Sequence, residues 1–200
     1  MSTSSPRAVG RRERNKQDKL DRITVAAREL FTERGIDDVT TQEIADRADI
    51  GSGTLFLYAR TKGELLMLVQ NSDYADALAR GTAAADAAPD VLDAVVAIIG
   101  PIVACNRVRV DNGRTYLREM VFGDPAEPHH REALAMNAQT ENAIAEVLQR
   151  DGRFRSGDAT TLARIVSAIM LACLAPTVNA ARTVDDLIAE IRRQIAVLLR

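Results

Sequence analysis

The stretch from Thr40 to Lys62, TTQEIADRADIGSGTLFLYARTK, constrains the fold more than any other part of the sequence. Thr40 followed three residues later by Glu43 is the pattern of a capping box, which predicts a short helix beginning at the next residue. Asp49 stands where the chain must turn sharply, because Asp tolerates the left-handed backbone conformation better than most residues. A second short helix is expected from about Ser52 to Tyr58, so the stretch indicates a helix-turn-helix.

Two helices of this length are not stable alone, so a third must support them. We expect it from about Asn15 to Arg34, where apolar residues recur at helical spacing, with Gly35 ending it. The apolar seam between the two short helices is expected to contain Ile44, Ala48, Ile50 and Leu55.

The start of the second short helix is unusual, because each interior Gly costs about 1 kcal/mol relative to Ala. Small residues let a backbone approach a partner closely, and in a helix-turn-helix this end of the helix enters the major groove of DNA. The alternative is a flexible helical hairpin with a Gly-rich corner. We predict contacts with bases or phosphates from Thr41, Gln42, Gly51, Ser52, Gly53, Thr54, Tyr58 and Lys62.

A second capping pattern, Thr61 with Glu64, predicts a long helix immediately afterwards. The order G-T-L-F-L-Y-A-R-T-K-G-E-L-L resembles the DNA-binding domain of the tetracycline-repressor-type (TetR) family, over about Ile23 to Leu66. Members are dimeric repressors in which a ligand entering the C-terminal domain releases DNA. The resemblance implies the same function here.

The sequence departs from the family pattern at several positions. The family usually has Tyr where Phe56 stands, so a hydroxyl that contacts phosphate is missing, and Tyr58 is expected to supply one instead. Ser is usual where Gly51 stands, and Gly is usual where Asp49 stands. These changes affect individual contacts with DNA, not the prediction of a helix-turn-helix domain.

Composition alone argues mildly against a DNA-binding protein, because the net charge of the 200 residues is −2. The distribution of charge along the chain favours a DNA-binding protein, since residues 1–22 hold seven basic side chains against three acidic ones, a local excess of four. Such an arm adds salt-dependent affinity for phosphate, although residues 1–10 fit a solvated tail equally well.

Cys105 and Cys173 lie far apart in apolar surroundings, a pattern typical of free, buried thiols in a cytosolic protein. We find no signal region and no apolar run long enough to span a membrane, so a cytoplasmic location is expected. No cofactor is expected.

The rest of the chain predicts an all-α protein of about nine helices, with a helix-turn-helix domain at 1–60 and a ligand-binding and dimerisation domain at 61–200. A connector is expected at residues 81–90 and a turn at 111–113. The six later helices are expected at about Thr61–Arg80, Val91–Arg109 with a kink or break at Gly100-Pro101, Arg114–Phe122, His129–Arg150, Asp158–Ala175 and from Thr183 onward.

The last two helices are amphipathic and would expose a large apolar patch on a monomer. Paired across a two-fold axis they would form a four-helix bundle, whereas the alternative is that they cover the core of their own chain. The predicted dimer interface consists of Ile169, Met170, Ile191 and Ile195.

An effector pocket is expected among the central helices, for a mostly apolar molecule with one or two polar groups. Its predicted lining is Asn106, Arg109, Tyr116, Met120, Met136 and Thr140.

Catalysis has little support. His129-His130 with Asp124 and Glu132 could suggest a metal, but adjacent histidines lack the i, i+4 spacing of helical ligands, and we predict a solvated loop. No G-x-S-x-G or P-loop occurs. The sequence therefore favours a regulator, with a helical enzyme or ligand carrier that has lost DNA binding, or a regulator without a ligand, as alternatives.

Overall fold

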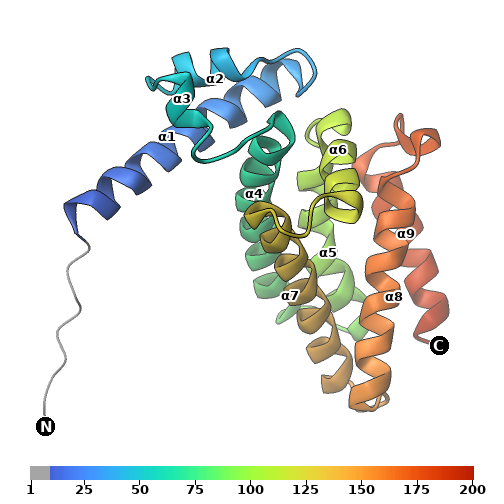
Figure 1. Ribbon diagram of the computed structural model, residues 1–200. Helices are drawn as coiled ribbons and strands as arrows, with labels where there is room; N and C mark the ends of the chain where they lie inside the picture. The colour runs from blue at the N-terminus through green and yellow to red at the C-terminus, as the bar shows by residue number, and fades with distance from the viewer. Residues whose placement is uncertain (1–9) are drawn as a thin grey trace, which may run out of the picture.

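The computed structural model describes residues 10–200; residues 1–9, which hold part of the predicted basic arm, lie outside the described residues. Every regular element in the described range is helical, which confirms the predicted all-α fold (Figure 1). The helices are α1 (Arg11–Arg34), α2 (Thr41–Arg47), α3 (Ser52–Leu55), α4 (Lys62–Ala85), α5 (Val91–Arg107), α6 (Val110–Phe122), α7 (Pro128–Arg150), α8 (Ser156–Leu174) and α9 (Val184–Leu198), with a 3-10 turn at Thr177–Asn179.

Helices α1 to α3 form an N-terminal head, and the helices from α4 onward form a body below it (Figure 1). The predicted capping box at the start of α2 is confirmed, because Thr40 and Glu43 each bond the backbone N–H of the other. The chain turns at Asp49, whose φ of 53° confirms the predicted left-handed conformation. Ile44 and Leu55 are fully buried and join the two short helices.

The carboxylate of Glu43 also ties α2 to α1. The Thr40 backbone N–H and hydroxyl, together with the Arg34 guanidinium 2.8 Å away, lower the pKa of Glu43 to about 2. Glu43 therefore stays ionised and holds the start of α2 through the whole neutral and mildly acidic range.

Helix α3 is shorter than predicted. After Leu55 the backbone continues in i to i+3 turns, with the N–H of Leu57 bonded to Thr54 and that of Tyr58 bonded to Leu55. Two glycines at its start leave little intrinsic helix preference to extend it.

Helix α4 connects the head to the body and extends five residues past the predicted end, to Ala85. The second capping box is only half formed: Thr61 accepts from the Glu64 N–H, but the Glu64 carboxylate accepts from the N–H of Arg60. Helix α4 continues through Gly81 because its most extensive packing partner, α5, approaches closely there. A methyl group on Gly81 would overlap the Ile98 carbonyl oxygen and lie 2.8 Å from the Ile98 Cα atom.

Helix α5 runs through Gly100-Pro101, so of the kink or break predicted there the break is wrong. Pro101 lacks the N–H that would bond the Ala97 carbonyl, and this carbonyl lies beside Gly81 of α4. Close packing against α4 thus holds α5 together where the proline removes a hydrogen bond.

The predicted turn at residues 111–113 is also wrong, because these residues lie in the first turn of α6, which is turned by 112° from α5. Gly113 packs directly on the Asn106 backbone, where a side chain would not fit. The Asn106 side chain, predicted to contact a ligand, instead donates to the Gly113 carbonyl at 3.1 Å. These residues build a close helix corner and not a hairpin turn.

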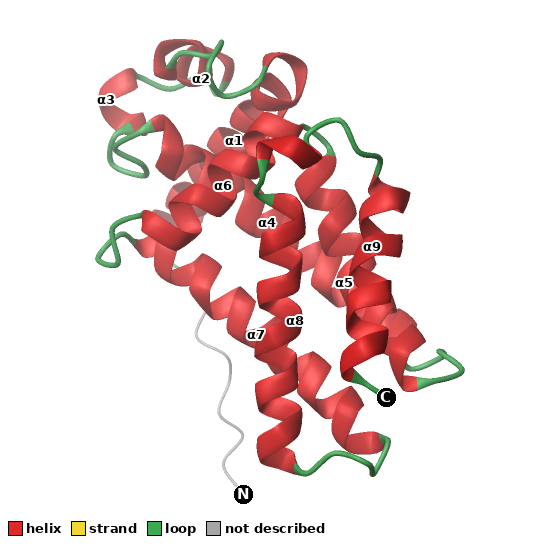
Figure 2. Ribbon diagram, turned by 90° about the vertical axis from the view of Figure 1, so that its right-hand side faces the viewer, coloured by secondary structure: helices red, strands yellow, loops and turns green. Residues whose placement is uncertain are grey.

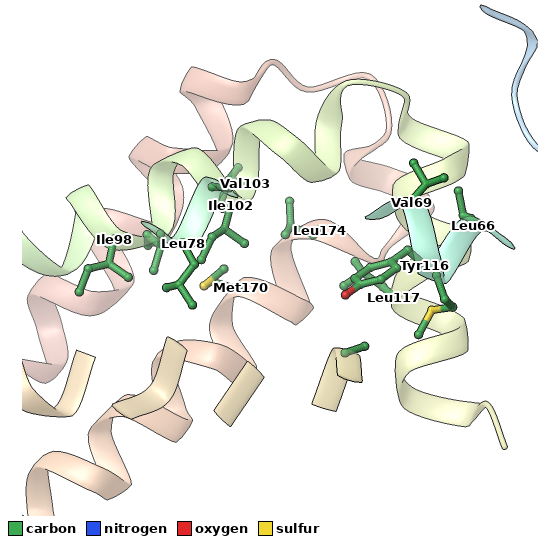
Figure 3. Close-up of a cluster of buried hydrophobic side chains, with 14 of the residues drawn as sticks. Leu66, Val69, Leu78, Ile98, Ile102, Val103, Tyr116, Leu117, Met170 and Leu174 are labelled. Atoms are coloured by element: carbon green, nitrogen blue, oxygen red, sulfur yellow. The ribbon is translucent and has the colours of Figure 1, made fainter. Parts of the chain in front are cut away.

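The body core lies between α4, α5, α6 and α8, and Figure 3 shows Tyr116 and Leu117 of α6 beside Val69 of α4. Helix α7 covers α4 and α8, and α9 packs on α5 and α8. Figure 1 shows α8 and α9 side by side at one edge of the molecule, and in Figure 2 this pair faces the viewer.

We predict that Gly81→Ala destabilises the protein by about 1 to 3 kcal/mol, because the added methyl forces α4 and α5 apart. Gly157→Ala in α8 is the matched control, since its added methyl meets nothing within 4 Å, and it should be neutral or slightly stabilising. Urea unfolding of both variants measures this. Equal stability of the two variants would contradict the close packing.

Candidate functional site

The helix-turn-helix brings together two of its predicted DNA-contacting residues, Gln42 and Ser52. The Ser52 hydroxyl donates to the Gln42 Oε1 atom at 2.5 Å, and the Gln42 amide donates to Asp46 at 2.7 Å. Gly51 and Gly53 are exposed, and a methyl group on either would meet nothing within 4 Å. Packing within the chain therefore does not require these glycines, and without side chains they leave the backbone at the start of α3 accessible.

A groove of about 790 Å³ runs between α1 and the segment from Thr54 to Tyr58, lined on the α1 side by three cations, Arg12, Lys16 and Lys19, and by Glu13 and Asn15. Thr54, Leu57 and Tyr58 line the opposite side. The Tyr58 hydroxyl, predicted to contact phosphate, donates to the Lys16 carbonyl at 3.3 Å. In this arrangement Tyr58 fixes α1 against the segment after α3, while the cations beside it face the groove.

Lys62, predicted to bind phosphate, lies at the junction of head and body. Its ammonium donates to the carbonyl oxygens of Ile36 and Asp37, at 2.9 and 3.3 Å. An ammonium group has three donors, so two are used within the chain and one remains.

Arg109, predicted to contact a ligand, reaches instead to the end of α1. Its guanidinium donates to the carbonyls of Thr32, Glu33 and Arg34, at 3.4, 3.4 and 2.8 Å. It therefore lies outside the body core and binds carbonyl groups that helix geometry leaves without a partner.

Asn112 of α6 completes this contact. Its amide donates to the Phe31 carbonyl at 2.8 Å, and its oxygen accepts from the Ile36 N–H at 2.9 Å. Asn112 is only 3% exposed, so these two bonds form in a dry environment. We call the contacts made by Arg109, Asn112 and Lys62 the α1 clamp.

The body contains a small, partly open cavity of about 30 Å³ between α4, α6, α7 and α8. Of the six residues predicted to line a pocket, Met120 lies on it, and Thr140 bonds the hydroxyl of its lining residue Tyr74 at 3.0 Å. Met136 and Tyr116 are buried in the core nearby. The full lining is Tyr74, Leu117, Met120, Asn137, Ser167, Met170, Leu171 and Leu174.

Sequence patterns did not single out Tyr74, Asn137 and Ser167 as pocket residues. Burial raises the pKa of Tyr74 to about 12, so its hydroxyl stays neutral. The Ser167 hydroxyl oxygen is buried and has no hydrogen-bond partner. Ser167 lines the cavity while the next residue, Ala168, is exposed, and only the helical phase of α8 could have indicated this.

The two histidines form part of the structure, so the prediction of a solvated loop is wrong. They lie in the first turn of α7, where His130 is 6% exposed and its Nε2 atom lies 3.0 Å from the Met120 carbonyl oxygen. His129 lies 3.3 Å from the Tyr58 carbonyl of the head and 3.6 Å from the Glu132 carboxylate. Within residues 10–200, no group of three or more His, Cys, Asp or Glu side chains is arranged to hold a metal.

Asn71 of α4 joins these residues to the core. It accepts from the Tyr116 hydroxyl at 2.9 Å and donates to the His129 carbonyl and the Glu132 carboxylate, at 2.8 and 3.1 Å. Asn71 is 1% exposed. Burial raises the pKa of Tyr116, so the Tyr116 hydroxyl at the core end of this network stays protonated and uncharged.

Three of the four residues predicted at a dimer interface face the core of their own chain. Ile191 and Ile195 are fully buried and Met170 is 6% exposed, whereas Ile169 is partly buried. The three buried residues are therefore unavailable to a partner. A different stripe of α8, with Ile165, Ala168 and Ala172, is exposed.

The cysteines are free, as predicted. Burial raises the pKa of Cys105 to about 11, which keeps its thiol protonated near neutral pH. Among the described helices, α8 alone is long and apolar enough to be a candidate membrane span, and 33% of its apolar stretch is buried. Helices α5 and α6 meet the same criteria only when taken together as a bent pair.

The geometry defines a helix-turn-helix protein whose head is clamped to a larger helical body. The sequence profile described as "Bacterial regulatory proteins, tetR family" matches residues 23–68, which extend from α1 into α4. The match shows that the helix-turn-helix head and the beginning of α4 are similar to this family. No curated protein matches the chain.

Solved structures share the fold over nearly the whole chain. A TetR transcriptional regulator from Rhodococcus sp. RHA1 is 20% identical with a TM-score of 0.71, covering 92% of this chain and 97% of that one. Thermus thermophilus FadR, a TetR-family repressor in complex with lauroyl-CoA, is 22% identical with a TM-score of 0.71, covering 90% and 92%. RolR, in complex with resorcinol, is 19% identical with a TM-score of 0.64, covering 90% and 89%.

Proposed function

We propose that the protein is a transcriptional repressor that binds operator DNA as a homodimer in the cytoplasm and is released by a small, mostly apolar effector. The single observation that carries this proposal is the surface where Gln42 and Ser52 meet, beside two exposed glycines that packing does not require. The domain boundary proposed near residue 60 falls just before α4 begins at Lys62.

The proposed contacts with DNA divide into two groups. Thr41, Gln42, Gly51, Ser52, Gly53 and Thr54 face the major groove, where amide and hydroxyl groups bond base edges. Lys62 uses its third donor for phosphate, and Tyr58 reaches phosphate if its hydroxyl turns away from Lys16. The cations of the α1 groove add affinity without sequence preference.

We predict that Gln42→Ala relaxes preference at one base pair, at a cost of about 1 to 3 kcal/mol, because it removes a base contact. Lys62→Ala should weaken binding to all DNA sequences alike. It should also reduce the slope of log affinity against log salt concentration by about one unit. Fluorescence anisotropy with DNA from upstream of the protein's own coding sequence measures both. Arg150→Ala, at the far end of α7, is the control and should change neither.

Loss of sequence preference in both variants would contradict this division. An absence of DNA binding by the parent protein would instead favour a helical ligand carrier or enzyme with an inactive hairpin.

The proposed dimer interface is the uncovered face of α8 and α9. Ile165, Ala168 and Ala172 form one exposed stripe on α8, and Ala189 and Val197 lie on an exposed stripe of α9. This face explains why α8 is so apolar and yet mostly unburied. Two such helix pairs related by a two-fold axis form a four-helix bundle.

We predict that Ile165→Glu produces monomers and weakens operator binding at least tenfold, because two half-sites require two heads. Leu134→Glu on α7 is the matched control, since Leu134 is 45% exposed against 38% for Ile165. Sedimentation velocity and DNA binding of both variants test this. A dimeric Ile165→Glu protein would place the interface elsewhere.

The proposed effector site is the small cavity of the body, where no charged side chain is part of the lining. At about 30 Å³ it holds about one water molecule, so an effector must displace Met120 and Met170, whose flexible side chains adapt readily. Tyr74, Asn137 and the unpaired Ser167 hydroxyl offer polar contacts. A neutral molecule with one or two polar groups fits this lining.

We predict that an effector weakens operator binding about 5- to 150-fold and that operator DNA weakens effector binding by the same factor. Resorcinol and lauroyl-CoA, bound by two proteins of the same fold, are the first compounds to titrate with and without DNA. Ser167→Ala should lower effector affinity without changing operator affinity. Thr160→Ala is the control, because Thr160 is an exposed hydroxyl residue two turns earlier on α8, and it should change neither affinity.

Equal effector affinity with and without DNA would rule out that compound as the effector. Failure of a broad screen of compounds would favour a regulator without a ligand.

A further inference from the structure

A groove of about 500 Å³ lies between α6 and the end of α8. Leu171 and Ala175 line it from α8, and Asp37, in the loop after α1, lines it from the head. Val121 and Phe122 of α6, 45% and 82% exposed, add apolar surface that the chain itself leaves uncovered. The volume falls within the range of about 300 to 1,000 Å³ that is typical of sites for small molecules.

Two leucines separate this groove from the small cavity of the body. Leu117 of α6, which is 8% exposed, and Leu171 of α8, which is half-buried, line both spaces, and the two linings share no other residue. Leucine side chains move between staggered rotamers, so a rotation of either one joins the groove to the cavity. A ligand can therefore occupy the groove with one end and the cavity with the other.

Arg114 of α6 gives the groove a positive charge without a counter-ion close by. Its Nε atom donates to the Ala175 carbonyl at 3.1 Å, and its Nη2 atom donates to the Thr177 hydroxyl at 2.8 Å, so both acceptors are uncharged. Among residues 10–200, no carboxylate oxygen lies within 4.0 Å of the Arg114 nitrogens. A guanidinium has five N–H donors, so three remain for a ligand.

A second guanidinium lies one turn further along the same face of α6. Arg118 follows Arg114 by four residues, which places the two side chains next to each other on the helix surface. Arg118 is 66% exposed and pairs with its neighbour Glu119 at 3.0 Å. Leu117 lies between the two arginines in the sequence, so both cations are close to the passage into the cavity.

Two carboxylates also line the groove, but they lie toward the head. Asp37 belongs to the head, and Asp111 is in the first turn of α6, where Asn112 binds α1. The lining is therefore acidic where α6 meets the head and basic further along α6. This order of charges places an anion beside the passage and not at the head.

We propose that the groove and the cavity form one site for an amphipathic anion, whose carboxylate binds Arg114 and Arg118 and whose apolar chain extends between Leu117 and Leu171 into the cavity. A guanidinium can donate two parallel hydrogen bonds to a carboxylate, which fixes the charged end. The uncharged lining of the cavity then surrounds only the apolar end. Release of DNA by such a molecule rests on the proposed function, whereas its binding does not.

The first test compares octanoate, octan-1-ol and octylammonium, which have the same apolar chain and different ends. Isothermal titration calorimetry of the full chain, below the concentrations at which these compounds form micelles, measures their affinities. We expect octanoate to bind about tenfold more tightly than the alcohol, and octylammonium to bind most weakly. Octylammonium binding as tightly as octanoate, or no saturable binding of octanoate, would overturn the proposal.

Variants separate recognition of the charge from a structural effect. Arg114→Gln should weaken octanoate binding about tenfold and leave octan-1-ol binding unchanged, whereas Arg114→Lys should keep most of the preference for octanoate. Arg150→Gln, at the far end of α7, is the matched control and should change neither affinity. Equal loss of octanoate and octan-1-ol binding in Arg114→Gln would show that Arg114 only holds α6 against the end of α8.

The second test follows the apolar chain of the ligand into the cavity. The chain of the protein has five methionines, and labelling their methyl groups with carbon-13 gives five NMR signals. Octanoate should shift the signals of Met120 and Met170, which line the cavity. Met67 is 2% exposed and does not line it, so its signal is the control and should stay in place. Unchanged Met120 and Met170 signals at saturating octanoate would overturn the joined site.

These measurements use no DNA, so their outcome is independent of the proposed function. Octanoate binding with the expected shifts, in a protein that does not bind operator DNA, would support the site and remove the regulator. Operator binding in a protein that fails both octanoate tests would overturn the site and leave the regulator in place.

Discussion

The arrangement of head and body depends on the carbonyl groups at the end of α1. The last carbonyls of any helix lack partners within the helix, and they carry the negative end of its dipole. Here Arg109 binds three of them, while Asn112 donates to the Phe31 carbonyl, which also accepts from the Gly35 N–H, and accepts from the N–H of Ile36. Because hydrogen bonds are directional, this α1 clamp fixes the orientation of the head more tightly than apolar contacts alone would.

The clamp also gives α6 two roles. Asn112, in its first turn, holds α1, while Leu117 and Met120 further along line the cavity of the body. A molecule that opens the cavity by displacing Leu117 or Met120 moves this part of α6, and a rigid helix carries such a shift to its first turn. The head is therefore connected to the body through α4, which continues the chain, through α6, and through the contact of His129 on α7 with the Tyr58 carbonyl.

The body is tightly packed where α4 meets α5 and loosely packed around its cavity. Close packing of Gly81 against the Ile98 backbone leaves α4 and α5 little freedom to separate. Elsewhere in the body, two methionines and three leucines border a cavity too small for an effector. Interiors resist compression, so a ligand that enters there displaces α6 or α7 before it displaces α5.

The sequence by itself determined the local structure of this protein: the capping box at Thr40, the left-handed turn at Asp49, the end of α1 at Gly35 and the helical phase of most later elements. Each of these depends on neighbours within about four residues, so spacing alone reveals it. The surface where Gln42 and Ser52 meet was predictable for the same reason, because one turn joins the two short helices.

Only the tertiary structure decided which hydrogen-bond partners the polar side chains have. Arg109 and Asn112 lie more than 70 residues along the chain from the carbonyls they bind. Ile191 and Ile195 face inward because α9 packs on α5. His129 is half-buried because α7 begins against the head. A periodic pattern shows that a helix has an apolar face, but the partner of that face is set by long-range packing, which the pattern does not encode.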